Sequence, residues 1–540
     1  MNVAHFLPER AHSAPNHIAI HCATPLHHYM SYTYKELEEL SNSYAQGIAH
    51  YGIKKGHRIV LMIRPGIDFI ATTFALMKLG VVVVLIDPGI GHQFLAECIK
   101  NVEPHGFFGV PKAHLLRVLS PSSFATSHFN VVVGPRWFFG VRTLSSFLSS
   151  TPSTPVLIET RDSDPAAIIF TTGSTGLPKG VVYEHGMFLS QIKILQEHYK
   201  IGASDVDMPT FPLFALFSVA MGTTCVIPHM DPTKPALVNP ENIIRPILDK
   251  KVTYCFGSPA LWHRVTEYCL DKKISLPSIK RVLIAGAPVR SELLERFTKI
   301  LSTDAHVYTP YGATEALPVT SIDHHDILSH TAKLTQTGKG ICVGSAFKNV
   351  SVKIIKITEN AIPHWKQELE LQSNQIGEIC VMGPHITKEY FHNLRGTALA
   401  KIKEAESLWH RMGDVGYLDS DHRLWFCGRK AHRVVTQNGQ TLFSIPCESI
   451  FNQHKEVFRA ALVGVHGVPI IVIEPKNKKI LTLQNELKRL QKELLTLGSL
   501  NTLTVSIRKI LFHPSFPVDI RHNAKINREK LTEWASTELA

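Results

Sequence analysis

The stretch Thr171-Thr172-Gly173-Ser174-Thr175-Gly176-Leu177-Pro178-Lys179-Gly180 decides the interpretation of this 540-residue chain. It follows the apolar run 166–170, which predicts a buried strand. Glycines let a backbone approach a phosphate closely, hydroxyl groups donate hydrogen bonds to it, and a lysine adds a positive charge. The spacing excludes a Walker A loop, because Pro178 stands where that motif needs glycine. We therefore predict a phosphate-binding loop of another kind.

Strands and helices alternate around this loop. A strand is predicted over 58–63, a helix over 67–79, and a second strand over the continuous apolar run 81–86. Such a β-branched run is typical of a parallel strand that is buried on both faces. The strand–helix–strand order, repeated by the later apolar run 282–285, indicates an α/β sheet.

Two other segments carry local predictions. Thr33 and Glu36 have the spacing of a capping box, so we expect a helix to begin there and to end at Tyr51, before a glycine. The interval 118–164 is rich in Ser, Pro and Thr, which predicts an excursion on the surface rather than a part of the sheet.

The composition excludes a disordered or fibrous chain, because 44% of the residues are hydrophobic and 19% are charged. The net charge is +12, and the 17 basic and 9 acidic residues from Arg429 onward account for +8 of it. A basic tail suits phosphate ligands, an anionic membrane surface, nucleic acid or plain solvation. No zinc-finger spacing, aromatic RNA-binding pattern or long basic block supports nucleic acid. We expect no nucleic-acid partner and at most peripheral membrane contact.

Cysteine usage and the chain start bear on the compartment. The nine cysteines are scattered, and none forms a C-x-x-C pair, which favours a reducing compartment. The first residues lack a basic segment followed by an apolar one, so we expect no secretory signal and a cytoplasmic location. Pro209–Pro228 is uncharged over a membrane-spanning length, but its three prolines favour buried core.

After Gly428 the pattern changes. Two short apolar runs, 460–465 and 470–474, predict strands, and a helix with leucines on one face follows them. We therefore expect two domains, 1–428 and 429–540, of which the second is a small α+β unit.

Four further motifs stand in a fixed order after the loop: Gly286-Ala287-Pro288, Tyr311-Gly312-Ala313-Thr314-Glu315, Asp414 with Gly428-Arg429, and Lys525. With the loop, this set resembles the acyl-adenylate-forming (AMP-binding) superfamily, which includes acyl-CoA synthetases, peptide-synthetase adenylation domains and luciferases. The resemblance covers nearly the whole chain. It implies an α/β fold with two domains. The large N-terminal domain consists of α/β subdomains and a small β-barrel region, and the smaller C-terminal domain is α+β and mobile.

The resemblance also implies roles for the residues that match. The aromatic ring of the pentapeptide would stack on adenine, its Thr314 hydroxyl would hold the α-phosphate, and its Glu315 carboxylate would hold Mg²⁺, which prefers oxygen ligands. The two oxygens of Asp414 suit the two ribose hydroxyls. ATP and Mg²⁺ are the implied cofactors, and Thr172 joins Glu315 as a metal ligand. The nucleotide-binding positions are Thr171, Thr172, Gly173, Ser174, Thr175, Gly176, Gly286, Ala287, Pro288, Tyr311, Gly312, Asp414 and Arg429.

The implied reaction starts with attack of a carboxylate on the α-phosphate of ATP, which releases pyrophosphate and leaves an acyl-adenylate. Lys179 would offset phosphate charge, and Lys525 would stabilise the negative charge that builds at phosphorus in the transition state. The catalytic positions are therefore Lys525, Lys179, Glu315, Thr314 and His185. His185 follows the loop by five residues, where relatives often keep a histidine near the acyl carbonyl. It is a candidate base or, alternatively, a packing residue.

One departure from the family pattern bears on what captures the acyl group. Relatives carry Asp in a hinge motif G-R-x-D, and this chain has Ala431 there. That Asp serves a domain rotation which admits a thiol, so its loss puts ordinary thioester formation in question. The stretches 85–89, 210–217, 426–433 and 516–525 resemble the olefin β-lactone synthetases, long labelled fatty-acid CoA ligases.

Three functions follow from these observations. The first is adenylation of a 2-alkyl-3-hydroxy fatty acid and attack of its own 3-hydroxyl to close a β-lactone with release of AMP, which makes the chain an AMP-forming ligase. The second is a fatty acyl-CoA or acyl-carrier-protein ligase. The third is a non-catalytic protein of this fold that binds nucleotide or acyl ligand; the intact lysines and carboxylates argue against it. The partner is a small acyl substrate, and other olefin-pathway enzymes could work beside this one.

The acyl chain needs an apolar slot. Phe211, Phe214, Phe217 and Phe256 fall where relatives line theirs, with plain core as the alternative. The run Asp323-His324-His325-Asp326 has metal-ligand residue types, but we interpret it as a polar loop.

Overall fold

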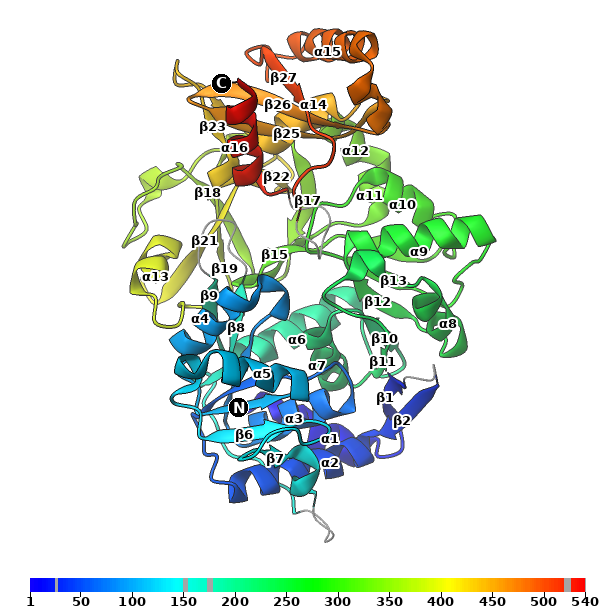
Figure 1. The fold of residues 1–540 in the computed structure, drawn as a ribbon, viewed down its shortest axis with the longest axis vertical. Helices are drawn as coiled ribbons and strands as arrows, with labels where there is room; N and C mark the ends of the chain where they lie inside the picture. The colour runs from blue at the N-terminus through cyan, green and yellow to red at the C-terminus, as the bar shows by residue number, and fades with distance from the viewer. Residues whose placement is uncertain (25–27, 149–153, 172–177, 519–525, 540) are drawn as a thin grey trace.

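The computed structural model describes every residue except 25–27, 149–153, 172–177, 519–525 and 540 (Figure 1). Two seven-stranded sheets, one antiparallel sheet and a small C-terminal sheet organise the chain. Its helices are α1 (Phe6–Ser13), α2 (Tyr34–His50), α3 (Ile67–Lys78), α4 (His92–Val102), α5 (Pro111–Leu119), α6 (His185–Tyr199), α7 (Pro212–Met221), α8 (Glu241–Asp249), α9 (Pro259–Lys272), α10 (Ser291–Phe297), α11 (His324–Asp326), α12 (Ala332–Gln336), α13 (Leu394–Ala400), α14 (Ser444–Phe451), α15 (Gln484–Ser499) and α16 (Arg528–Leu539).

The first sheet carries the phosphate-loop segment. Its order is β7-β6-β5-β3-β4-β8-β9, and only β9 runs antiparallel to its neighbour. The predicted strands over 58–63 and 81–86 are its centre, as expected for apolar runs buried on both faces. The strands are β3 (Arg58–Met62), β4 (Val82–Leu85), β5 (Gly106–Gly109), β6 (Phe129–Val132), β7 (Arg142–Thr143), β8 (Pro165–Thr171) and β9 (Lys179–Glu184).

The second sheet has the order β14-β13-β12-β10-β11-β1-β2, with β2 antiparallel to β1. It contains the strand predicted over 282–285 and part of the uncharged stretch Pro209–Pro228, which is buried core. The strands are β1 (Ile18–Ala23), β2 (Tyr29–Thr33), β10 (Val206–Pro209), β11 (Thr224–Ile227), β12 (Tyr254–Gly257), β13 (Arg281–Ile284) and β14 (His306–Tyr308).

Helices fill the space between these two sheets and cover their outer faces. On β3, Ile59 and Leu61 join the large core that also contains α2, α3, α6 and α7, whereas Val60 faces the core under α4 and α5. This alternation is what a strand between two helical layers requires. Helices α8, α9 and α10 cover the other face of the second sheet.

The third sheet is the region expected as a small barrel. It is antiparallel, with the order β15-β16-β17-β22-β21-β19-β18, and β20 pairs with β21. Its strands are β15 (Tyr311–Ala313), β16 (Ala316–Ser321), β17 (Ile341–Ala346), β18 (Ser351–Ile355), β19 (Gly377–Met382), β20 (Lys401–Glu404), β21 (Ser407–Leu418) and β22 (Leu424–Arg429).

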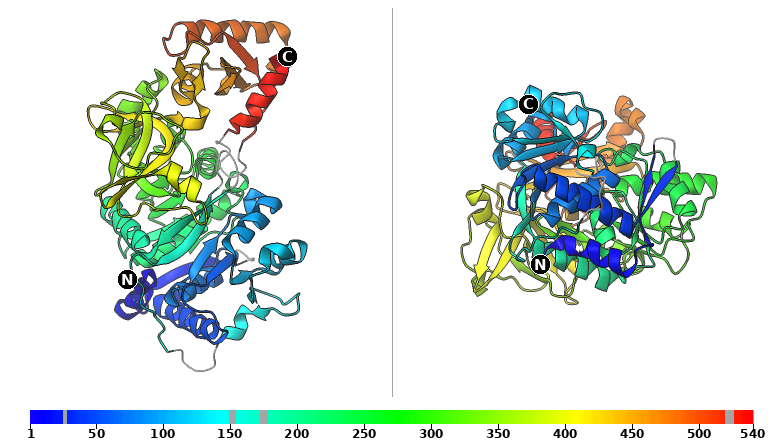
Figure 2. Two further views of the ribbon diagram at one scale, coloured as in Figure 1. Left: turned by 90° about the vertical axis from the view of Figure 1, so that its left-hand side faces the viewer. Right: turned by 90° about the horizontal axis from the view of Figure 1, so that it is seen from below.

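The C-terminal part forms one end of the molecule, drawn in orange and red in Figure 2. The sheet β25-β26-β27 has α14 and α15 on one face and α16 on the other, so its two cores are separate. Of the leucines predicted to line α15, Leu490 and Leu494 are buried, whereas Leu483 precedes the helix and is exposed. The strands here are β23 (Val434–Val435), β24 (Thr441–Leu442), β25 (Val457–Val465), β26 (Val468–Pro475) and β27 (Lys509–Phe512).

Two local predictions have different outcomes. The capping box is present: the Thr33 hydroxyl accepts from the Glu36 N–H, and the Glu36 carboxylate accepts from the Thr33 N–H. The prediction of a surface excursion over 118–164 is wrong for residues 129–132, because β6 pairs with β5 and Val131 and Val132 are buried.

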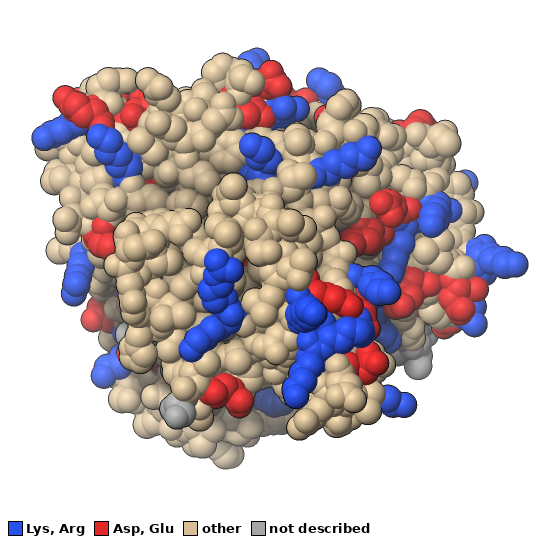
Figure 3. All heavy atoms as spheres, turned by 90° about the horizontal axis from the view of Figure 1, so that it is seen from above, with Lys and Arg blue, Asp and Glu red and all other residues tan. Residues whose placement is uncertain are grey.

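Charge and membrane features complete the description. The C-terminal end shows basic side chains beside acidic ones in Figure 3, and Arg489 pairs with Glu456, Glu486 and Glu493. All nine cysteines are buried and unpaired. Within the described ranges, no helix is long and apolar enough to cross a membrane.

Candidate active site

A large open cleft lies where the sheets and the C-terminal part meet. Lining residues come from β9, from the loops after β12 and β13, from β15, from the middle of β21 and from the end of β22. On its C-terminal side the cleft is lined by Val518, Ile526 and Arg528 among others. The fold therefore brings together residues that are far apart in the sequence, such as Lys179 and Arg528.

One side of the cleft is built around Asp414. The Tyr311 hydroxyl donates to its Oδ2 at 2.6 Å, and Arg429 donates to its Oδ1 at 2.8 Å. Asp414 and Arg429 are register partners on β21 and β22, so the sheet itself sets this ion pair. Asp414 raises the pKa of Arg429, and burial beside the carboxylate raises the pKa of Tyr311 well above its ordinary value. The three residues were all predicted to bind nucleotide, and the structure places them in direct contact.

The adenine-side loop and the pentapeptide frame the same wall. Gly286, Ala287 and Pro288 follow β13 and line the cleft, as do Gly312 and Thr314 in and after β15. Gly286 has φ +95°, which a glycine adopts without the strain that another residue would meet. The backbone carbonyl of Thr314 accepts a hydrogen bond from the Tyr183 hydroxyl, which fixes the turn that carries the next residue, Glu315.

The same wall continues with an acid and a lysine. Glu315 accepts a hydrogen bond at Oε1 from the Tyr390 hydroxyl at 2.8 Å, and its backbone carbonyl accepts from the N–H and hydroxyl of Thr387. The Lys179 ammonium lies over the Tyr390 ring, 4.9 Å from its centroid. Tyr390 thus joins the predicted metal-binding carboxylate to the predicted phosphate-binding lysine. No local sequence pattern points to Tyr390, because its contacts are with residues far away in the sequence.

Two more residues of this wall escaped prediction. Lys401 and His410 are register partners on β20 and β21, and Lys401 donates to the Thr387 carbonyl. Burial lowers the pKa of Lys401 to about 7, an effect that Glu315 opposes. Burial, with Lys401 nearby, lowers the pKa of His410 well below its ordinary value. The only signal for His410 was its place in the run Trp409–Asp414.

The surroundings of His410 favour one protonation state of its ring. The Ala400 backbone hydrogen-bonds to it, and among the described residues its Nδ1 has no hydrogen-bond partner and is buried. Lys179 and Arg429 also add positive potential at the ring. His410 therefore lies at the edge of the cleft with a buried ring whose lowered pKa favours the neutral form.

The predicted acyl slot is present as an aromatic cluster. Phe214 lies 4.2 Å from Phe256, 5.6 Å from Phe211 and 6.0 Å from Phe217 between ring centroids. All four rings line the cleft. The uncharged stretch that carries three of them is therefore both core and cleft wall.

The structure does not place His185 with these residues. It begins α6, is fully buried, and its Nδ1 accepts from the Val3 N–H at 3.2 Å. Burial lowers its pKa to about 4, with the chain's N-terminus as a second cause. His185 is not among the cleft-lining residues, so this geometry does not support a role as base.

Some predicted residues lie outside the described ranges. Thr172, Gly173, Ser174, Thr175, Gly176 and Lys525 are in this group, and Thr171 is described only as the end of β8. Thr171 pairs with Lys179 across the loop. Val518 and Ile526, which flank the segment that holds Lys525, pair with each other and line the cleft.

The altered hinge position lies at the edge of the cleft. Ala431 belongs to a short turn, 430–432, directly after β22. Its neighbour Lys430 pairs with Glu378 at 3.3 Å and donates to the Thr358 carbonyl, while Arg433 pairs with Glu359. The turn is thus anchored to the third sheet by its basic residues, although no carboxylate stands at position 431.

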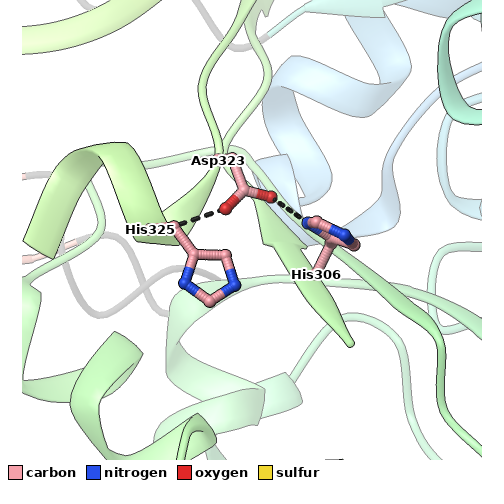
Figure 4. A group of neighbouring side chains, drawn as sticks. All are labelled: His306, Asp323 and His325. Carbon is pink, nitrogen blue, oxygen red and sulfur yellow. Dashed lines mark hydrogen bonds and ion pairs between the residues drawn. The ribbon is translucent and has the colours of Figure 1, made fainter. Parts of the chain in front are cut away.

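The polar run after β16 forms a cluster away from this wall (Figure 4). Asp323 accepts from His306 Nδ1 at 2.7 Å and from the His325 N–H at 2.8 Å, and so caps the short helix α11. Ligand atoms of the three residues lie within 4.8 Å of one another. Because the contacts already give the carboxylate a capping role, we keep the polar-loop interpretation.

Comparisons with known proteins agree with this geometry. A model of the family described as AMP-binding enzyme matches residues 7–391. Olefin beta-lactone synthetase from Stenotrophomonas maltophilia is 42% identical over 100% of this chain and 98% of its own length. The protein of the same name from Xanthomonas campestris is 41% identical over 99% and 98%. The structure of an amide bond synthetase from Marinactinospora thermotolerans matches with a TM-score of 0.79 at 20% identity, covering 99% of each chain.

Proposed function

The chain belongs to the AMP-binding enzyme family, and on that premise we propose that it adenylates a 2-alkyl-3-hydroxy fatty acid and closes it to a β-lactone. The observation that carries the proposal is identity of 41–42% over essentially the whole chain with two proteins named olefin beta-lactone synthetase. The chain is accordingly an AMP-forming ligase whose substrates are ATP and a small acyl acid.

The first half-reaction joins the acid to AMP. A carboxylate oxygen bonds to the α-phosphorus of ATP, and the bond from that phosphorus to pyrophosphate breaks. Asp414, oriented by Tyr311 and Arg429, suits the ribose hydroxyls. Lys179 lines the cleft and is proposed to offset phosphate charge, and Lys525 is proposed to stabilise the transition state.

The residues of the cleft also fit a divalent cation. The Glu315 carboxylate is hydrogen-bonded by one donor and borders the cleft, and hard cations such as Mg²⁺ prefer such oxygens. We propose that Glu315 and Thr172 would hold Mg²⁺, which would neutralise phosphate charge when bound.

The second half-reaction closes the ring. The substrate's 3-hydroxyl oxygen bonds to the acyl carbon, the bond from that carbon to AMP breaks, and the hydroxyl proton leaves. The attack is intramolecular, so positioning by the cleft replaces a second substrate. We propose His410 as the proton acceptor, because it is among the cleft-lining residues and His185 is not.

The alternative is transfer of the acyl group to a thiol. The aromatic slot and the adenylation wall would serve a fatty acyl-CoA ligase equally well. What favours lactone closure is Ala431, since the hinge acid that serves the thiol-accepting state is missing. We further propose the domain boundary at 428, a cytoplasmic location, a role in lipid metabolism and work beside other olefin-pathway enzymes.

The test measures AMP and product with ATP, Mg²⁺ and a synthetic 2-alkyl-3-hydroxy acid, with and without CoA. We expect CoA to leave the rate of AMP release unchanged and the product to lack one water relative to the acid. AMP release that requires CoA, with a thioester as product, would establish the ligase instead.

A further inference from the structure

An exposed apolar face lies on α5 and the loop that follows β6. Val118 and Leu119 are 63% and 68% exposed, and Leu115 is 43% exposed on the same side of the helix, three to four residues away. In the loop, Trp137 is 61% exposed and Phe139 is 99% exposed. We name this set the α5 face: Leu115, Val118, Leu119, Trp137 and Phe139.

The loop is attached to the helix rather than separate from it. The His114 ring of α5 hydrogen-bonds to the Val131 carbonyl at 3.0 Å, which joins the helix to β6. The rings of His114 and Phe138 are 6.3 Å apart between centroids, so the loop packs on the start of α5. Phe138 is partly buried, whereas its aromatic neighbours Trp137 and Phe139 are exposed.

The charge of this part of the chain has one sign. Between Glu103 and Glu159 there is no Asp or Glu, whereas there are four Lys or Arg: Lys112, Arg117, Arg136 and Arg142. Lys112 and Arg136 are exposed, the first on α5 and the second directly before Trp137. On the C-terminal end, by contrast, acidic side chains lie beside basic ones (Figure 3).

The α5 face is also continuous with the cleft. Lys112, Leu115 and Leu119 line the cleft as well as belonging to α5. Figure 1 draws α5 just above β6 and β7, and the left view of Figure 2 shows this blue-to-cyan region at one side of the molecule. An acyl chain that leaves a lipid phase at this face would enter the cleft along one helix.

We propose that the α5 face is a docking surface for an anionic lipid bilayer. Exposed Trp and Phe side chains are suited to the interface between head groups and acyl chains, and adjacent Lys and Arg are attracted to anionic head groups. The absence of acidic residues across 104–158 removes the repulsion that such a surface would otherwise meet. Entry of the acyl chain along α5 rests on the proposed function; bilayer binding does not.

Vesicle flotation with the full-length protein tests the proposal without ATP or substrate. The probes are phosphatidylcholine vesicles with and without phosphatidylglycerol. We expect binding to the anionic vesicles only, weaker at high salt because the attraction of the basic residues is screened. The double variant W137S/F139S should bind about tenfold less, and Arg136→Gln should bind less at low salt but not at high salt.

A matched control distinguishes binding through the α5 face from non-specific hydrophobic binding. Leu500 is 80% exposed in the C-terminal part, so Leu500→Ser removes apolar surface at another place. It should bind as the unaltered protein does, and W137S/F139S should retain its melting temperature and its turnover of a short-chain acid.

Three outcomes would overturn the proposal. The unaltered protein could fail to float with anionic vesicles, W137S/F139S could float as well as the parent, or Leu500→Ser could lose as much binding as the double variant. A dimer in solution that W137S/F139S abolishes, without vesicle binding, would assign the face to a second copy of the chain. Because none of these measurements uses catalysis, their failure leaves the lactone proposal to its own test.

Discussion

At the scale of single residues, the two histidines near the phosphate loop show what a sequence can and cannot place. His185 is close to the loop in the sequence, but it is fully buried at the start of α6 and is not among the cleft-lining residues. His410 is 231 residues beyond Lys179, yet Lys179 contributes to the potential at its ring. Position in the sequence alone therefore does not show which histidine borders the cleft.

This difference makes a prediction. His410→Gln should leave ATP–pyrophosphate exchange with the acid largely intact and slow lactone formation about 100-fold, because only ring closure needs the proton acceptor. His185→Gln should lower the melting temperature and leave the ratio of the two rates unchanged, because its ring accepts from the Val3 N–H.

The two rates are measured on the same preparation, so that a folding defect lowers both. If His185→Gln slowed lactone formation alone while exchange persisted, the base would be His185 after all, and the assignment to His410 would be wrong.

Other residues of the site could be predicted because they belong to the sequence motifs that carry the resemblance. Tyr311, Asp414 and Arg429 were assigned to the nucleotide from the resemblance, and the structure joins them by two hydrogen bonds. Tyr390 and Lys401 could not be predicted, because no local pattern distinguishes them from a core tyrosine and a surface lysine. Their contacts with Glu315 and Thr387 join segments of the third-sheet region that are 14 to 75 residues apart in the sequence.

At the scale of elements, strands with apolar residues on both faces were the easiest to predict. β3 and β4 lie within one residue of their expected bounds. β6 was missed because it has only four residues, and the Ser, Pro and Thr around it dominated the composition of the segment. Its pairing with β5 is a long-range contact that outweighs local propensity.

The capping box of α2 gives a prediction at this scale. Thr33→Ala removes the hydroxyl that accepts from the Glu36 N–H, and should cost about 1 kcal/mol of unfolding free energy. The measurement is the shift of the denaturation midpoint against Thr33→Ser, which keeps the hydroxyl and should cost much less. Equal destabilisation by both variants would show that the methyl group, not the cap, matters at this site.

A buried carboxyl links β10 to α7 and gives a pH prediction. Asp207 is buried, accepts from the Ser218 hydroxyl, and burial raises its pKa to about 8. In the unfolded state this carboxyl has a pKa of about 4. As the pH rises, it therefore loses its proton at a lower pH in the unfolded state than in the folded state. The stability from this group is complete below about pH 4 and is lost as the pH rises toward about 8, by at most about 1.4 kcal/mol per pH unit.

Asp207→Asn should flatten this dependence. The measurement is the unfolding midpoint at several pH values between about 5 and about 8, with Asp304→Asn, an exposed site, as the control for the lost charge. If the unfolding midpoint of the parent protein depended on pH no more than that of Asp207→Asn does, the raised pKa of Asp207 would be contradicted.

At the scale of the whole molecule, three separate parts build one site. The first sheet supplies Lys179, the third supplies Glu315 and Asp414, and the C-terminal part borders the cleft through Val518 and Ile526. The number and order of these parts followed from the motifs and from the change of pattern after Gly428. How they pack on one another could not be predicted, because it depends on cores shared between segments far apart in the chain.

The central claim is that the substrate's own hydroxyl displaces AMP from its own activated carboxyl group. The most direct test uses a 2-alkyl-3-hydroxy acid whose two carboxyl oxygens are both ¹⁸O, with mass spectrometry of AMP and lactone. Carboxyl activation predicts one heavy oxygen in AMP and one in the lactone, because the carboxyl group gives up one oxygen with AMP and the ring oxygen comes from the unlabelled hydroxyl. A lactone with both heavy oxygens and an unlabelled AMP would mean that the hydroxyl was activated instead, and would contradict the account.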